Sequence, residues 1–101
     1  MTDQFNTSFS SFLDKWQERI DTYYEKDFKS LKVPYLTFTI GKKYLKVISD
    51  NSVRAFVNMA TGDVLKAAGW NAPAKHARGN IFSINNGMDA IDCKGHVIYL
   101  N

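Results

Sequence analysis

The chain has 101 residues, a length that suits one domain, because two separate cores would each be too small to be stable. Hydrophobic residues make up 45% and charged residues 23%, which excludes a disordered chain, and no apolar run is long enough for a transmembrane helix. The single cysteine, Cys93, excludes an internal disulfide, and the N-terminus lacks the features of a secretory signal, so we expect a reducing, cytoplasmic location.

The net charge of +3 is unevenly distributed along the chain. Residues 31–80 carry eight bases and two acids, a net charge of +6, whereas residues 1–30 carry −2 and residues 81–101 carry −1. A positive field confined to the middle of the chain favours a negatively charged partner.

The first 30 residues predict an amphipathic helix. Apolar residues recur at intervals of three and four, at Phe9, Phe12, Leu13, Trp16, Ile20, Tyr23, Tyr24 and Phe28. Ser30 and Pro34 mark its end. We expect its aromatic face to cover a sheet, and the alternative is that this face docks a partner.

Residues 31–68 predict antiparallel strands, at 33–40, 44–49, 53–59 and 64–68. The turns between them are two to four residues long, which is typical of a meander. Which side chains face the core depends on a register that the sequence leaves open.

Residues 81–101 predict closing strands, the last at 96–100. We expect four apolar side chains of this region in the core: Ile81, Phe82, Ile84 and, as a small buried residue, Cys93.

The stretch from Trp70 to Asn80 (WNAPAKHARGN), within a basic segment at 69–80, combines helix signals with cationic side chains. Asn71 is a good helix N-cap, Pro73 suits the first turn and Gly79 suits the position after the last turn. These signals predict a short helix or loop at 71–79. Its polar side chains either form an anion site or belong to a basic turn that is merely exposed to water. The candidate residues are Lys75, His76, Arg78 and Asn80.

The elements together predict an α+β fold in a single domain, residues 1–101. A long N-terminal helix packs on an antiparallel meander sheet of four to six strands, with the short helix or loop at the edge of the sheet.

Basic residues alternate with aromatics along the predicted strands, at Tyr44, Lys46, Arg54, Phe56, Lys66 and Trp70. Single-stranded nucleic acid is bound in this way, with bases stacked on aromatic rings and cations following the phosphates. The alternative is that Phe56 and Trp70 belong to the core and the lysines protect strand edges. No signature of a known RNA-binding module accompanies the pattern.

Metal binding and catalysis are both disfavoured. A metal site would combine Asp92, Cys93 and His96 with the remote His76, but one Cys-x-x-His spacing is a weak signal, because structural zinc sites offer two such pairs. As an enzyme the chain would use His76 as general acid or base, but it has no nucleophile elbow, phosphate loop or paired carboxylates. We therefore predict no metal, no cofactor and no enzymatic activity.

Two runs, Thr61–Trp70 (TGDVLKAAGW) and Ala72–Asn80 (APAKHARGN), resemble a group of small tailed-bacteriophage proteins that are similar to this chain over residues 42–101. The resemblance implies a phage protein acting in the host cytoplasm. It assigns no role to any single residue, and the N-terminal helix lies outside it.

Two classes of function follow. In the first, a small phage accessory protein binds single-stranded DNA or RNA through a basic sheet face and loop, with the contact residues Lys46, Arg54, Lys66, Trp70, Lys75, His76, Arg78 and Asn80. The alternative is a host-takeover or anti-defence protein that binds a host protein or a nucleotide signal. We expect no membrane partner, and a bare sheet edge near Lys42 and Lys43 leaves a homodimer open.

Overall fold

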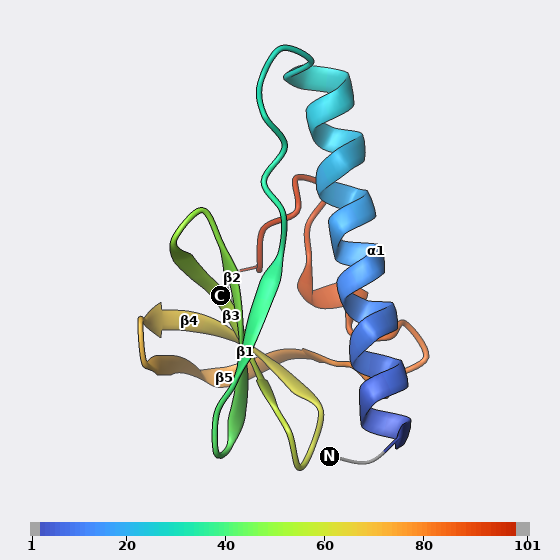
Figure 1. Cartoon of the computed structure of the whole chain (residues 1–101). Coiled ribbons are helices and arrows are strands. Elements are labelled where there is room, and N and C mark those ends of the chain that lie inside the picture. The colour runs from blue at the N-terminus through green and yellow to red at the C-terminus, as the bar shows by residue number, and fades with distance from the viewer. Residues whose placement is uncertain (1–2, 99–101) are drawn as a thin grey trace.

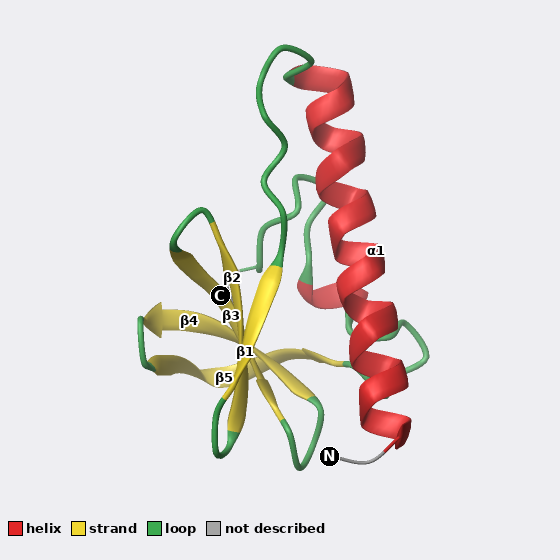
Figure 2. Ribbon diagram, viewed as in Figure 1, coloured by secondary structure: helices red, strands yellow, loops and turns green. Residues whose placement is uncertain are grey.

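The computed structural model describes residues 3–98 and shows one long helix packed against a single sheet (Figures 1 and 2). In chain order the elements are α1 (Asp3–Asp27), β1 (Thr37–Ile40), β2 (Tyr44–Ser49), β3 (Ser52–Asn58), β4 (Asp63–Gly69), β5 (Ala72–Asn80) and the short 3-10 helix η1 (Met88–Ala90). The predicted α+β class is confirmed.

The sheet is an antiparallel meander, hydrogen-bonded in the order β1-β2-β3-β4-β5. Its five strands lie within the predicted range of four to six. The β2–β3 turn shows how short loops produce this order. Asp50 and Asn51 both have positive φ, 52° and 61°, and a two-residue turn of this kind follows the natural twist of the strands that it joins.

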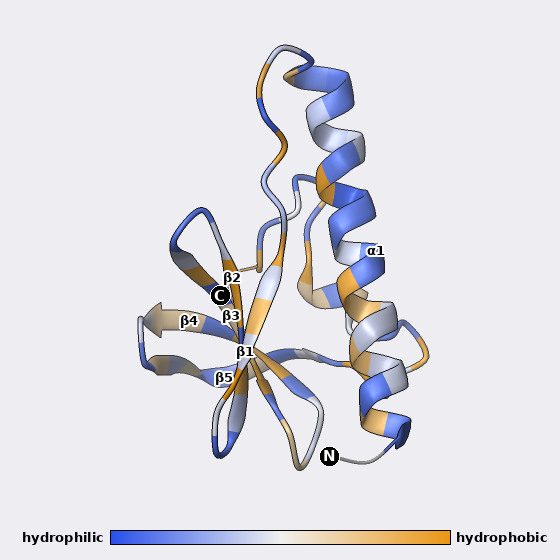
Figure 3. Ribbon diagram, in the orientation of Figure 1, coloured by the Kyte–Doolittle hydropathy of each residue, from blue (hydrophilic) through white to orange (hydrophobic). Residues whose placement is uncertain are grey.

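Helix α1 turns one apolar stripe toward the sheet. Its buried residues recur at intervals of three and four, at Phe5, Phe9, Phe12, Trp16 and Ile20, and in Figure 3 hydrophobic positions on α1 alternate with hydrophilic ones. The helix ends at Asp27, earlier than the predicted residue 30. Figure 1 shows the C-terminal part of α1 extending past the sheet, so the expected stripe stops at Tyr24, and Phe28 is exposed.

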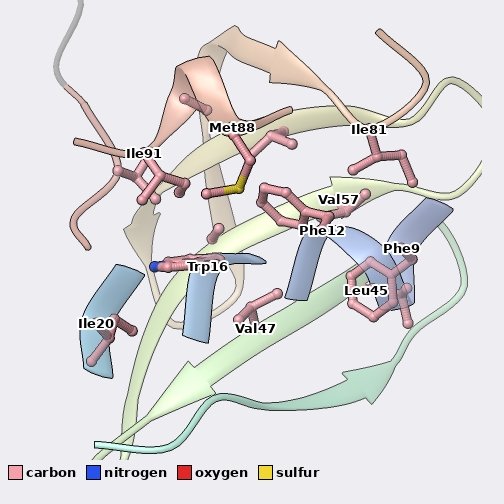
Figure 4. Close-up of a cluster of buried hydrophobic side chains, with 14 of the residues drawn as sticks. Phe9, Phe12, Trp16, Ile20, Leu45, Val47, Val57, Ile81, Met88 and Ile91 are labelled. Atoms are coloured by element: carbon pink, nitrogen blue, oxygen red, sulfur yellow. The ribbon is translucent and has the colours of Figure 1, made fainter. Parts of the chain in front are cut away.

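The core lies between α1, the sheet and the segment that follows β5 (Figure 4). The strands contribute Leu45, Val47, Ala55, Val57 and Val64, and the later segment contributes Ile81, Met88, Ala90, Ile91 and Val97. Figure 4 shows Phe12 and Trp16 between these two sets of side chains. The indole Nε1 of Trp16 also donates a hydrogen bond of 2.7 Å to the carbonyl oxygen of Gly95.

The prediction of a short helix or loop at 71–79 was wrong, because this segment forms strand β5. Its backbone pairs with β4, for example Leu65 with Ala77 and Val64 with Gly79. Gly79 serves close packing rather than a helix end, since a Cβ there would lie 3.0 Å from Asp89 Oδ1 and 3.2 Å from Ala90 Cβ of η1. Pairing with the neighbouring strand β4 thus overrode the local helix signals.

The predicted closing strands were also largely wrong. Between β5 and residue 98 the chain forms turns and η1, and it makes one isolated bridge, Ile91 to Val97. Residues 99 and 100 of the predicted last strand lie outside the described residues. Ile81 is buried as expected, but Ile84 and Cys93 are exposed and Phe82 is 40% exposed.

The first strand is shorter than predicted. Residues 33–36 approach the sheet without joining it, and β1 begins at Thr37. All four β1 residues are exposed, although Phe38 and Ile40 pair with the core residues Val47 and Leu45 and so lie on the side of the sheet that faces α1. As an edge strand, β1 has a hydrogen-bonded neighbour on one side only, and the Phe38 ring lies 5.1 Å from that of Phe9 on α1 while remaining 47% exposed.

Candidate nucleic-acid interface

The sheet face turned away from α1, here called the outer face, carries one row of cross-strand neighbours. Val57 and Val64 pair with each other and point into the core, so the adjacent pair, Phe56 and Leu65, points to the outer face. Lys46 pairs with Phe56 and lies beside it on β2. Phe56 is only 3% exposed, and its ring lies 5.7 Å from that of Tyr44 in a T-shaped contact. The outer face thus has a small apolar base of its own.

Lys46 and Trp70 meet at the rim of this base. The Lys46 ammonium lies 5.1 Å from the centroid of the Trp70 ring, and Nζ donates a hydrogen bond of 2.6 Å to Asn71 Oδ1. Trp70 and Asn71 form the turn between β4 and β5, which brings them over β2. The indole of Trp70 is 54% exposed. An exposed aromatic ring and a cation beside it are the two groups that bind a nucleotide of a single strand.

Lys75 and His76 lie farther along the same β4–β5 hairpin. Between Pro73 and Ala77 strand β5 advances four residues while β4 advances two, from Ala67 to Leu65, so this part of β5 bulges out of the ladder. Both side chains are exposed, and neither has a side-chain hydrogen bond or ion pair within residues 3–98. Both side chains are therefore accessible on the hairpin that carries Trp70.

Arg54 and Lys66 lie on the opposite side of the sheet, which corrects the expectation that they share a face with Lys46 and Phe56. Lys66 pairs with the core residue Ala55 and therefore faces α1. Its Nζ donates a hydrogen bond of 3.3 Å to the carbonyl oxygen of Val97. Arg54 is the extra residue of a β-bulge, because Val47 pairs with Ala55 and Ile48 with Val53. It lines a hollow together with Trp16 of α1.

Arg78 and Asn80 are held by the fold. Arg78 donates from Nε to the carbonyl oxygen of Ile98 at 3.3 Å and from a terminal nitrogen to the carbonyl oxygen of His76. Asn80 Nδ2 donates to Thr61 O at 2.8 Å and to Asp63 Oδ1 at 3.0 Å, while its Oδ1 accepts from the Phe82 amide at 2.8 Å. Because the Arg78 and Asn80 side chains are used in these internal hydrogen bonds, the expected cluster of Lys75, His76, Arg78 and Asn80 does not form one site.

Sequence reasoning missed Asn71 as a member of the site. It was interpreted as a helix N-cap, and its side chain instead orients the Lys46 ammonium. The sequence feature that could have identified it is an amide side chain next to a tryptophan. This pair can be interpreted as a two-residue turn only once residues 72–80 are known to form a strand.

Metal ligands do not gather in the part of the chain that the structure describes. Within residues 3–98 no three side chains of His, Cys, Asp or Glu lie close enough together to hold a metal ion. The Asp92 carboxylate instead accepts hydrogen bonds of 2.9 Å from the backbone amides of Lys94 and His96.

No helix within the described range is long and apolar enough to cross a membrane. Searches of curated proteins and of solved structures found no match. A family model described as "Family of unknown function (DUF7717)" matches residues 2–100, nearly the whole chain. The chain therefore belongs to the DUF7717 family.

Proposed function

We propose that this protein is a phage accessory protein that binds single-stranded DNA or RNA through the outer face of its sheet. The central contact is formed by Lys46 and Trp70, and Lys75 and His76 continue it along β5. The observation that carries the proposal is the half-exposed Trp70 ring with the Lys46 ammonium 5.1 Å from its centroid.

The two groups have complementary tasks. An aromatic ring accepts a stacked base of any identity, and one such contact contributes about 1–3 kcal/mol. A lysine beside the ring follows the phosphate that links this base to the next. Since the ammonium of Lys46 lies over one side of the indole, the base stacks on the other side and its phosphate turns back toward Nζ.

The site is smaller than the sequence indicated. Arg54 and Lys66 lie on the side of the sheet that faces α1, and Arg78 is hydrogen-bonded to backbone carbonyls. With two or three cations left at the contact, the logarithm of the binding constant should fall with the logarithm of salt concentration with a slope of only about −1.4 to −2. We infer binding that is weak, tolerant of sequence and a few nucleotides long.

Fluorescence anisotropy of a labelled oligothymidine without a terminal phosphate, measured at several salt concentrations, tests this proposal. We expect Trp70→Ala to weaken binding by about tenfold or more, in line with the loss of one stacked base. Lys46→Gln should weaken binding and reduce the salt slope by about 0.7. The matched controls are Phe82→Ala, which removes another exposed ring, and Lys29→Gln, which removes a cation beyond the end of α1. Equal losses in controls and site variants would contradict the proposal.

A different outcome separates the two classes of function. If the wild-type protein binds no oligonucleotide at low salt but retains a host protein through purification, the outer face is not a nucleic-acid interface. The alternative of a host-takeover protein would then replace it.

A further inference from the structure

Arg54 and Lys66, the two predicted site residues that face α1, line a hollow on that side of the sheet. It is formed by two adjoining cavities of about 70 Å³ and about 120 Å³, and Trp16, Arg54, Gly95 and His96 line both. Its walls come from α1, from the end of the β2–β3 hairpin and from the loop 92–98. We propose that this hollow, called the loop hollow below, binds the phosphate group of a small phosphate monoester.

Arg54 supplies the main positive charge. The β-bulge in β3 adds this one residue to the strand, and its side chain lines the hollow beside Trp16 rather than joining the outer face. Within residues 3–98 the guanidinium has no hydrogen bond and no ion pair. A half-buried guanidinium with five donors and no acceptor matches the terminal oxygens of a phosphate.

Ser49 adds a buried hydroxyl donor at the same place. It lines the cavity of about 70 Å³ together with Arg54, it is 3% exposed, and its Oγ has no hydrogen-bond partner among the described residues. Buried hydroxyl groups nearly always have a partner. We expect an oxyanion bound at Arg54 to accept a hydrogen bond from this hydroxyl.

The loop 92–98 forms a rigid wall of the hollow. Gly95 has a φ of 86°, its carbonyl accepts the Trp16 indole N–H at 2.7 Å, and a Cβ there would lie 2.5 Å from Ile20 Cγ1. The loop is therefore fixed on α1 at this glycine, and the neighbours of Gly95, Lys94 and His96, both line the hollow. Their backbone amides donate hydrogen bonds of 2.9 Å to the Asp92 carboxylate, which fixes the backbone of the loop beside the hollow.

Charge and size select the ligand class. Arg54, Lys66, Lys94 and His96 line the two cavities, and Asp50 is the carboxylate among the residues that line them. Cavities of about 70 Å³ and about 120 Å³ suit a phosphate group rather than a nucleic-acid strand. Tyr24, Pro34 and Leu36 form an apolar margin on one side, where the body of the ligand would lie.

A titration followed by two-dimensional ¹H–¹⁵N NMR of the full chain tests the proposal, with inorganic phosphate, adenosine 5′-monophosphate and adenosine as probes. We expect saturable shifts of the Trp16 indole N–H and the Gly95 amide with both phosphate-bearing probes, and none with adenosine. Tighter binding of the nucleotide than of inorganic phosphate would indicate that the apolar margin contacts the nucleoside. Equal binding would indicate that the site recognises only the phosphate group. Either result supports the phosphate site.

Variants separate this site from the outer face. Arg54→Gln should weaken binding of inorganic phosphate by about tenfold or more, and Arg54→Lys should retain part of it. Ser49→Ala should weaken binding severalfold, and Lys46→Gln, on the outer face, should change it less than twofold. The proposal is overturned if no probe gives saturable shifts, if adenosine binds as well as its phosphate, or if Arg54→Gln folds and binds like the wild type. Because oligothymidine without a terminal phosphate tests the outer face alone, either site can fail without the other.

Discussion

The two faces of the sheet differ in what covers them and in which cations they carry. The face toward α1 is closed by Phe5, Phe9, Phe12 and Trp16, and its cations gather at one end, under the loop 92–98. The outer face has an apolar base that includes Tyr44, Phe56 and Leu65, and Lys46 lies there beside the exposed ring of Trp70. One face is covered by α1 and holds the core, whereas the other carries the half-exposed Trp70 beside Lys46, although both derive from the same alternating strands.

The largest expected effect lies on the closed face. Phe12 is fully buried between α1, the sheet and η1, so Phe12→Ala should lower the free energy of unfolding by about 3–5 kcal/mol. Urea denaturation followed by circular dichroism measures this loss. Trp70→Ala is the matched control on the outer face and should cost less than about 1 kcal/mol, because more than half of that side chain is already in water. Similar losses for the two variants would break the distinction between the faces.

A smaller effect is expected at Asn80, where the sequence indicated an anion site. Its side chain makes three hydrogen bonds that join the 61–63 turn to Phe82. Asn80→Ala should therefore lower the free energy of unfolding by about 1–3 kcal/mol and leave oligonucleotide affinity within about twofold. Lys75→Ala should show the reverse pattern, with unchanged stability and weaker binding. Urea denaturation and fluorescence anisotropy of both variants measure these opposite effects. A loss of binding in Asn80→Ala without a loss of stability would instead support the anion site that the sequence predicted.

The helix and strands β2 to β4 were predictable because their signals are local. Apolar residues at intervals of three and four define α1, and turns such as Asp50-Asn51 define the strand ends. Strand β5 was not predictable, because APAKHARGN lacks alternating apolar residues. With Asn71 before it, the segment presents an N-cap, a proline and a glycine in helix order. Only pairing with β4, a contact outside the segment, decides its conformation.

The candidate site was predictable in its residue types but not in its grouping. Aromatic and basic residues were identified, and Lys46 with Trp70 lie together. The separation of Arg54 from Phe56 depends on one extra residue in β3, and a bulge has no reliable signature in sequence. The side of the sheet on which Lys66 lies depends on strand register, which a shift of one residue would invert.

The two tryptophans provide the most direct test, because Trp70 lies at the outer face and Trp16 under the loop 92–98. Their indole N–H groups give two separate signals in ¹H–¹⁵N NMR spectra, which can be assigned with Trp70→Phe. On titration with oligothymidine that lacks a terminal phosphate, we predict that the Trp70 signal moves progressively with added strand and that the Trp16 signal stays in place. A strand that moves the Trp16 signal alone, or leaves both signals unchanged at low salt, would contradict the central claim that the outer face binds nucleic acid.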